Sequence, residues 1–134
     1  MHLLIVFSTF IVCTFAAVAQ YPVKIGEAVV LDLGPFIKNW ERQRKGHSKE
    51  SLSFCEEAKR LSDKKCTQFV DQNGHLTGSK AVVYENGTLV FESFTKEDVG
   101  SYFSKDERER VQQNADGTYW ALPRSLINIF VSEQ

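Results

Sequence analysis

The stretch that decides the fold of this chain is Glu85-Asn86-Gly87-Thr88-Leu89-Val90-Phe91-Glu92-Ser93-Phe94-Thr95-Lys96-Glu97-Asp98-Val99-Gly100-Ser101-Tyr102-Phe103-Ser104. It opens with Asn-Gly, the strongest short-range signal for a hairpin turn. Leu89 and Phe91 then alternate with Val90 and Glu92, which predicts a strand with one buried face. The residues from Asp98 to Tyr102 predict a tight turn into another strand. The stretch therefore indicates short strands joined by turns.

Six positions of this stretch resemble the end of an immunoglobulin-like domain. In that family a Leu-x-hydrophobe-x-x-hydrophobe pattern leads to Asp-x-Gly-x-Tyr, and the matching residues here are Leu89, Phe91, Phe94, Asp98, Gly100 and Tyr102. The family's tyrosine forms the tyrosine corner at the start of strand F. The resemblance implies that Asp98, Gly100 and Tyr102 form this structural corner. It also implies an ion pair between Asp98 and a basic residue near the start of strand D, for which Lys80 is the candidate.

The resemblance covers roughly Gly26 to Ser104, but both core cysteines of the family are replaced. Gly26, Val29 and Leu31 match the strand B pattern, in which Leu33 stands at the first cysteine position. Ser104 stands at the second, two residues after the corner tyrosine. Because both halves of the core disulfide are missing together, no orphan thiol results.

Trp40 corresponds in this resemblance to the strand C tryptophan that packs between the two sheets. Only six residues separate it from Leu33, which is fewer than the family usually has. The alternative is an exposed tryptophan, which would form a binding patch with Arg42 and Arg44. The resemblance favours the core interpretation.

Short strands at intervals of roughly 8–12 residues, with turn signals between them, predict an all-β fold. We expect a two-sheet immunoglobulin-like sandwich made by a single domain, residues 20–134. Further strands are expected at 20–24 (an edge strand), 28–33, 67–70, 80–84 and 126–131. Residues 42–53 indicate a loop or an edge, and residues 118–122 a strand or an aromatic loop. Between Cys55 and Cys66, helix-forming residues predict either a short helix or a wide hairpin loop.

The first residues of the chain, 1–19, predict a signal peptide. Leu3 to Phe15 is almost wholly apolar, and Ala17-Val18-Ala19 is a small-x-small cleavage motif before Gln20. The apolar run is too short and wrongly flanked for a membrane-spanning helix, although a signal anchor is the alternative. No later stretch is long and apolar enough to span a membrane. We therefore expect a secreted, extracellular protein without a membrane span.

The three cysteines divide between the signal peptide and the mature chain. Cys13 is expected to leave with the signal, so that Cys55 and Cys66 remain as an even pair. In an oxidising compartment such a pair predicts an intrachain disulfide, with intermolecular pairing as the alternative.

The overall layout also resembles an uncharacterised family of small secreted nematode proteins. The shared features are a signal peptide, the run Val-Val-Leu-Asp-Leu-Gly at 29–34, an early tryptophan and two cysteines. That resemblance implies no activity.

The net charge of −1 gives no electrostatic basis for binding nucleic acid or anionic lipid. The basic residues that do cluster are diluted by acidic neighbours, which indicates a solvated surface. They are Lys38, Arg42, Arg44, Lys45 and Lys49.

The sequence predicts no catalytic, cofactor-binding or metal-binding residues. His47 and His75 have no further ligand at a recognised spacing, and the two mature-chain cysteines lack the close spacing of structural zinc sites. No motif supplies a nucleophile together with a base and an orienting group. We therefore expect a protein that is not an enzyme and needs no cofactor.

Asn86-Gly87-Thr88 is an N-glycosylation sequon in a chain that we expect to be secreted. It lies on a predicted hairpin turn, which favours an exposed position. A glycan there is expected to shield that end of the sandwich, leaving the opposite end or a sheet face for partners.

Tyr119 and Trp120 lie in the long connection before the last strand and are the candidate partner-binding residues, although packing on the sheet is an equal alternative. Exposed aromatic residues commonly anchor protein interfaces. We expect an extracellular binding module that recognises a protein or a glycan through these loop aromatics. The alternative is a structural or packaging protein of a lumen or matrix, without a discrete high-affinity site.

Overall fold

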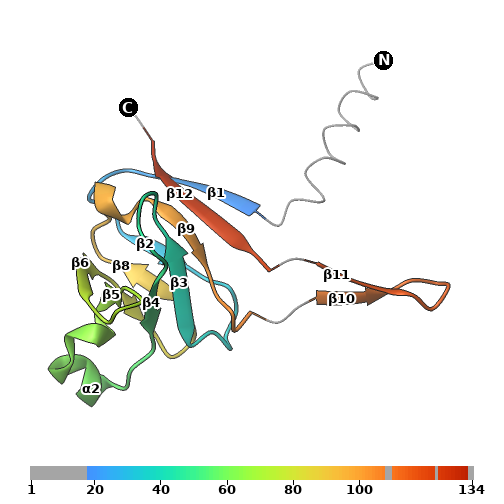
Figure 1. The fold of residues 1–134 in the computed structure, drawn as a ribbon, viewed down its shortest axis with the longest axis horizontal. Coiled ribbons are helices and arrows are strands. Elements are labelled where there is room, and N and C mark those ends of the chain that lie inside the picture. The colour runs from blue at the N-terminus through green and yellow to red at the C-terminus, as the bar shows by residue number, and fades with distance from the viewer. Residues whose placement is uncertain (1–17, 108–109, 123, 133–134) are drawn as a thin grey trace.

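The computed structural model describes residues 18–107, 110–122 and 124–132. These residues form a seven-stranded sheet, a three-stranded sheet and a two-stranded hairpin, with one short α-helix between the two cysteines. Figure 1 shows the hairpin projecting away from the rest of the fold. The prediction of an all-β sandwich with one short helix is confirmed. Only Val18 and Ala19 of the predicted signal peptide lie within the described residues.

The larger sheet contains strands from both ends of the described chain. Its order is β1 (Val18–Val23), β12 (Leu126–Val131), β9 (Gly100–Phe103), β3 (Asn39–Gln43), β4 (Glu50–Ser53), β5 (Gln68–Val70) and β6 (Leu76–Lys80). β1 runs parallel to β12, and the other pairings of this sheet are antiparallel. Pro22 lies in β1, an edge strand, where proline is tolerated.

The smaller sheet has the order β2 (Val29–Leu31), β8 (Leu89–Phe91) and β7 (Val82–Val83). The chain passes from the larger sheet to this one at Ala81, the residue between β6 and β7, whose N–H donates to Thr67 O over 3.1 Å. This crossing divides the strand predicted at 80–84. The expectation of a loop or edge at 42–53 is wrong, because this region contains β4, which pairs with strands on both sides.

The side chains between the two sheets form one hydrophobic core. Leu89 and Phe91 are both fully buried, as their alternation predicts. The ring of Phe91 meets Phe94 and Tyr102 edge to face, with centroids 5.3 and 5.6 Å apart. Such aromatic pairs add about 0.5–1.5 kcal/mol each beyond the burial of their area. Residues 85–104 therefore supply most of the aromatic centre of the core.

Trp40 on β3 connects the two sheets. Its side chain is fully buried, so it belongs to the core and not to an exposed patch. The indole Nε1–H donates over 2.8 Å to the carbonyl oxygen of Gly87, in the turn between β7 and β8. Leu33, at the first position where the family has a cysteine, packs against the core, and Ser104 at the second donates its hydroxyl to Asn39 O over 2.5 Å. At the two positions where the family has its core disulfide, this chain thus has the packing of Leu33 and the hydrogen bond of Ser104.

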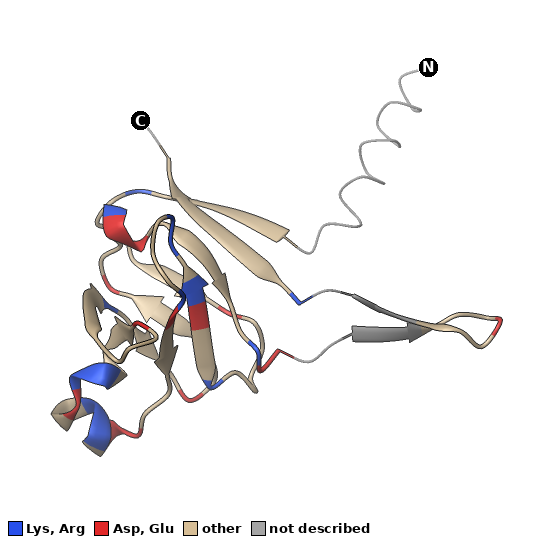
Figure 2. Ribbon diagram, in the orientation of Figure 1, with Lys and Arg blue, Asp and Glu red and all other residues tan. Residues whose placement is uncertain are grey.

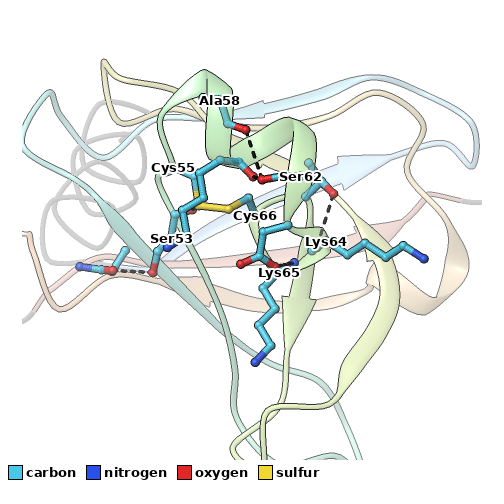
Figure 3. The surroundings of a disulfide bond; sticks show 11 residues. Ser53, Cys55, Ala58, Ser62, Lys64, Lys65 and Cys66 are labelled. Atoms are coloured by element: carbon cyan, nitrogen blue, oxygen red, sulfur yellow. Dashed lines mark hydrogen bonds between the residues drawn. A yellow bond between two sulfur atoms is a disulfide. The ribbon is translucent and has the colours of Figure 1, made fainter.

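The predicted disulfide joins Cys55 to Cys66, which are 11 residues apart in sequence. The enclosed segment contains α2 (Glu57–Ser62) and the 3-10 turn η1 (Lys64–Cys66). Figure 3 shows the sulfur–sulfur bond beside this short helix, where Ser62 donates to Ala58 O over 3.3 Å. No residue of α2 is buried. The disulfide rather than hydrophobic packing therefore holds α2 to the sandwich.

Candidate binding surface

Four segments gather at one end of the sandwich, which we call the loop end: residues 32–38, 84–88, 104–107 and the hairpin β10–β11. Asp106 Oδ2 accepts hydrogen bonds from the backbone N–H groups of Lys38 and Asn39 over 2.9 and 2.8 Å. On the other side of loop 32–38, a Cβ atom on Gly87 would lie 2.5 Å from Gly34 O. Because both contacts involve the same loop, segments far apart in the sequence meet here.

The hairpin consists of β10 (Arg110–Gln113) and β11 (Tyr119–Leu122), which pair with each other and with no other described strand. Its turn is closed by Asn114 N donating to Thr118 O over 2.7 Å. Asp116 Oδ1 accepts from the hydroxyl of Thr118 over 2.6 Å. A two-stranded hairpin on its own is at best marginally stable in water. The projection in Figure 1 is therefore a segment that its own sandwich does not cover.

The two candidate aromatic residues lie at the start of β11. The side chain of Tyr119 is 67% exposed. The side chain of Trp120 lies outside what the structure describes, and its backbone pairs with Gln112 in the register of the hairpin. The alternative of an aromatic loop is wrong, because residues 119–122 form a strand.

A cavity of about 390 Å³ lies where the hairpin leaves the sandwich. Its walls combine apolar residues with three acidic ones, and they are Asp32, Leu33, Gly34, Pro35, Phe36, Ile37, Asp106, Glu107 and Ser125. Burial opposes ionisation of Asp106, but the N–H groups of Lys38 and Asn39 outweigh it and hold the pKa of the Asp106 carboxyl below its usual value. The cavity thus has an anionic wall near neutral pH.

Glu107 ties together the two chain segments that lead into and out of the hairpin. Its carboxylate accepts from the backbone N–H of Ser125 over 2.6 Å and from the Ser125 hydroxyl over 2.7 Å. Arg124 Nε also donates to the carbonyl oxygen of Glu107 over 3.0 Å. These bonds fix the base of the hairpin although no sheet covers its strands.

The predicted glycosylation turn lies at this same loop end. Asn86 is exposed at the tip of the β7–β8 turn, whereas Gly87 is buried against loop 32–38. The contact between Gly87 and Gly34 places the sequon next to the cavity from which the hairpin emerges.

The opposite end of the sandwich holds a buried cluster of charged side chains around Arg42. Arg42 is fully buried, and its Nε donates to Glu50 Oε1 over 2.6 Å while Nη1 donates to Asp98 Oδ1 over 3.2 Å. Arg44 Nη2 adds a bond of 2.5 Å to the second oxygen of Glu50. The guanidinium carbon of Arg42 lies 4.1 Å from the ring centroid of Phe69, within cation–π range.

The expectation that the basic residues between 38 and 49 form a solvated surface is wrong for Arg42, which is buried, whereas Lys38 and Lys45 are exposed. Arg42 points into the core because it lies two residues after Trp40 on β3, on the same face of the strand. Burial opposes ionisation of Glu50, but the hydrogen bonds from Arg44 and Arg42 outweigh it and hold the pKa of the Glu50 carboxyl below its usual value. The buried charges therefore neutralise one another.

Asp98 is paired with Arg42 and not with Lys80, which is exposed. The same carboxylate closes the 3-10 turn η2 (Lys96–Asp98), since its second oxygen accepts from the N–H and the hydroxyl of Thr95 over 2.9 and 3.0 Å. Ser79 donates its hydroxyl to the first oxygen. The sequence missed Arg42 as the partner because Arg42 and Asp98 are 56 residues apart.

Tyr102 and Gly100 complete the corner that the resemblance implies. The Tyr102 hydroxyl donates to the carbonyl oxygen of Asp98 over 2.5 Å, the bond that defines a tyrosine corner. Burial raises the pKa of the Tyr102 hydroxyl well above its usual value, so it stays protonated. A Cβ atom on Gly100 would lie 2.7 Å from Gln43 O, so the close approach of β9 to β3 requires glycine.

The described residues contain no group of three or more His, Cys, Asp or Glu residues that would hold a metal ion. A second cavity, of about 380 Å³, borders Ser79 and Asp98, but these two groups bond to each other and to Arg42. Figure 2 shows acidic and basic residues interspersed along α2 and over the loops.

Comparison with protein families and with curated protein sequences finds no relative of this chain. Within the described residues, no helix is both long and apolar enough to cross a bilayer. The chain matches no protein-family model, and no curated protein sequence is significantly similar to it.

Proposed function

We propose that this protein is a secreted, non-enzymatic binding module with an immunoglobulin-like fold, which recognises an extracellular protein or glycan through its loop end. The observation that carries the proposal is the β10–β11 hairpin, which leaves the sandwich without a covering strand and exposes Tyr119. A tyrosine ring offers a large contact area and a polar tip, with few rotatable bonds to order on binding.

The arrangement of strands supports the immunoglobulin-like assignment. In a variable-type immunoglobulin sandwich, extra strands extend the sheet that contains strands G, F and C. In this chain β12, β9 and β3 lie side by side in that order, followed by β4 and β5, and the other sheet is formed by β2, β8 and β7. The buried Trp40 on β3 and the corner of Tyr102 occupy the corresponding places.

Two features support secretion. The bond between Cys55 and Cys66 persists in oxidising compartments and is uncommon in a reducing cytosol. Cleavage after Ala19 would remove from β1 only the exposed residues Val18 and Ala19, while the buried Val23 stays in place. Within the described residues, cleavage at this point would therefore leave the buried part of β1 in place.

The base of the hairpin supports a binding role over a merely loose loop. The bonds of Glu107 to Ser125 hold together the two segments that lead into and out of the hairpin, while the strands of the hairpin remain uncovered. A segment whose ends are held together loses less conformational entropy when it binds. The loop end therefore combines a concave surface, the acidic cavity, with a protruding one, the β10–β11 hairpin.

Photo-crosslinking tests the proposal directly. A photoreactive phenylalanine analogue replaces Tyr119 in one variant and Ile25 in the matched control. Ile25 is 60% exposed, and it lies at the opposite end of the sandwich, because the neighbouring Gly26 donates its N–H to Phe94 O, next to the turn that Asp98 closes. Both proteins are irradiated in extracellular fluid of the source organism. We expect a discrete heterologous product from position 119 only. Identical products from both positions would contradict the proposal, and products containing only copies of this chain would favour the structural alternative.

A further inference from the structure

We infer that Asn86 carries an N-linked glycan that stands over the cavity at the base of the hairpin and limits access to the loop end. The inference rests on the proposed function in one respect, since the chain must enter the secretory pathway. Beyond the proposed function, it specifies which atom is modified, where the sugar lies and how the sugar limits access to the loop end.

The reacting atom is the side-chain nitrogen of Asn86. Asn86 is exposed, and its Oδ1 accepts from the backbone N–H of Thr88 over 3.2 Å and from the Thr88 hydroxyl over 2.8 Å. Both bonds use the amide oxygen, and Nδ2 has no hydrogen-bond acceptor among the described residues. The sequon in its folded conformation thus leaves the nitrogen directed away from the bonds that organise the turn.

The chemistry is a transfer of oligosaccharide from a lipid-linked donor. A bond forms between Asn86 Nδ2 and the anomeric carbon of the sugar, while the bond from that carbon to the lipid diphosphate breaks. The diphosphate leaves with the bonding electrons, and the amide nitrogen gives up one proton. No oxidant or reductant is involved. The requirement is a hydroxyl residue two positions after the asparagine, which Thr88 supplies.

Gly87, the residue between them, holds the backbone of the turn against loop 32–38. Gly87 has φ +91° and lies so close to loop 32–38 that a Cβ atom would come within 2.5 Å of Gly34 O and 3.2 Å of Ile37 Cβ. Its carbonyl oxygen accepts the indole N–H of Trp40 from the core. Lys38 Nζ also donates to Glu85 O over 3.0 Å. The turn is therefore held on both sides of Asn86.

The cavity lies directly beside this anchored turn. Gly34 and Ile37, the residues that Gly87 touches, are also part of its wall, together with the exposed Phe36. An N-linked glycan is bulky and strongly hydrated. Attached one residue from Gly87, it occupies the space in front of loop 32–38. Any partner of the loop end then meets the sugar before it reaches the cavity.

Expression of the full chain in cultured animal cells tests the modification. We expect secreted protein that begins at Gln20 and that loses mass on treatment with peptide N-glycosidase. Asn86→Gln and Thr88→Ala are expected to abolish this mass shift, and Thr88→Ser to retain it. A secreted but unmodified chain would overturn the inference and leave the proposed function intact. A chain that stays unprocessed in the cytosol would overturn both.

Hydroxyl-radical footprinting tests the location of the glycan. The glycosylated protein is compared with the same protein trimmed enzymatically to a single N-acetylglucosamine, so that the polypeptide is unchanged. We expect the full glycan to slow oxidation of Phe36, which is 62% exposed, by about twofold or more through steric cover. Oxidation of Ile25, which is 60% exposed at the opposite end of the sandwich, is expected to stay the same. Equal rates at Phe36 in both forms would show that the sugar points elsewhere.

Discussion

The two ends of this sandwich differ in how their side chains meet solvent: one end buries charged groups, and the other exposes a hairpin. At the end that contains Arg42, charged side chains are taken into the core and bonded to one another, and Tyr102 and Asp98 lock the turn around them. At the loop end, by contrast, two strands leave the sandwich, and the side chain of Tyr119 is exposed to solvent. The comparison teaches that the buried charged cluster and the exposed hairpin lie at opposite ends of the sandwich, so that substitutions in the cluster and in the hairpin strands should have very different effects on stability.

The largest effect is expected where the buried charges lose their common partner. Arg42→Met leaves the carboxylates of Glu50 and Asp98 buried without their shared guanidinium. Removing one member of a buried ion pair costs about 3–5 kcal/mol. Urea unfolding measures the loss, with Lys45→Met as the exposed control. A loss below about 1 kcal/mol would mean that water reaches this end and that the contrast between the ends is smaller.

The disulfide comes next, because it holds a segment that packing does not. We expect the double variant Cys55→Ala/Cys66→Ala to lose about 3 kcal/mol, the chain-entropy value for a loop of roughly a dozen residues. Hydrogen exchange should show the loss of protection concentrated in α2, whose residues are all unburied. Protection retained in α2 would show that side-chain contacts anchor the helix after all.

A pair of glycine variants separates packing from backbone strain at the loop end. Gly26 and Gly87 have nearly the same φ, +89° and +91°, but an added Cβ meets nothing within 4 Å at Gly26 and lies 2.5 Å from Gly34 O at Gly87. Gly26→Ala should cost about 1–3 kcal/mol, the price of the strained φ alone. Gly87→Ala should cost clearly more in the same urea titration. Equal costs would indicate that loop 32–38 yields easily.

Acid is expected to weaken both ends, through different carboxylates. The pKa values of Glu50 and Asp106 are lower in the folded protein than in the unfolded chain, so the unfolded chain takes up protons first as the pH falls. Stability should therefore be constant near neutral pH and decline below about pH 5. Glu50→Gln should make that decline shallower in unfolding midpoints measured against pH. An unchanged slope would assign the acid sensitivity to other groups.

The smallest effect on stability is expected at the hairpin. Tyr119→Ala should change the free energy of unfolding by less than about 0.5 kcal/mol, because the ring is already 67% exposed. Thermal unfolding checks this, with Phe94→Ala as the buried aromatic comparison. A large loss from Tyr119→Ala would show that the ring packs on the sandwich, and the division between the two ends would fail.

Local patterns predicted much of the sandwich. The alternation of Leu89 with Phe91, the glycine turns and the even cysteine pair all depend on neighbours in sequence, and each is present. The position of Trp40 followed from a family pattern and agrees with its burial.

The remainder depends on contacts that no local pattern contains. Arg42 is buried because Glu50 and Asp98 come to it from other elements, and a basic residue among polar neighbours otherwise indicates solvent. In the same way, the common location of Asn86 and the hairpin follows from the packing of Gly87 on Gly34. Only a folded topology relates such distant segments.

Gly87 also has a consequence for how this protein can change over generations. The middle position of a sequon is usually free to vary, but here it is held by a core tryptophan and by the close approach of a loop. The flanking Asn86 and Thr88 bond chiefly to each other. If Asn86 is glycosylated as we propose, single codon changes at 86 or 88 would remove or restore the sugar without altering the contacts of Gly87, so that the modification could evolve separately from the packing of the turn.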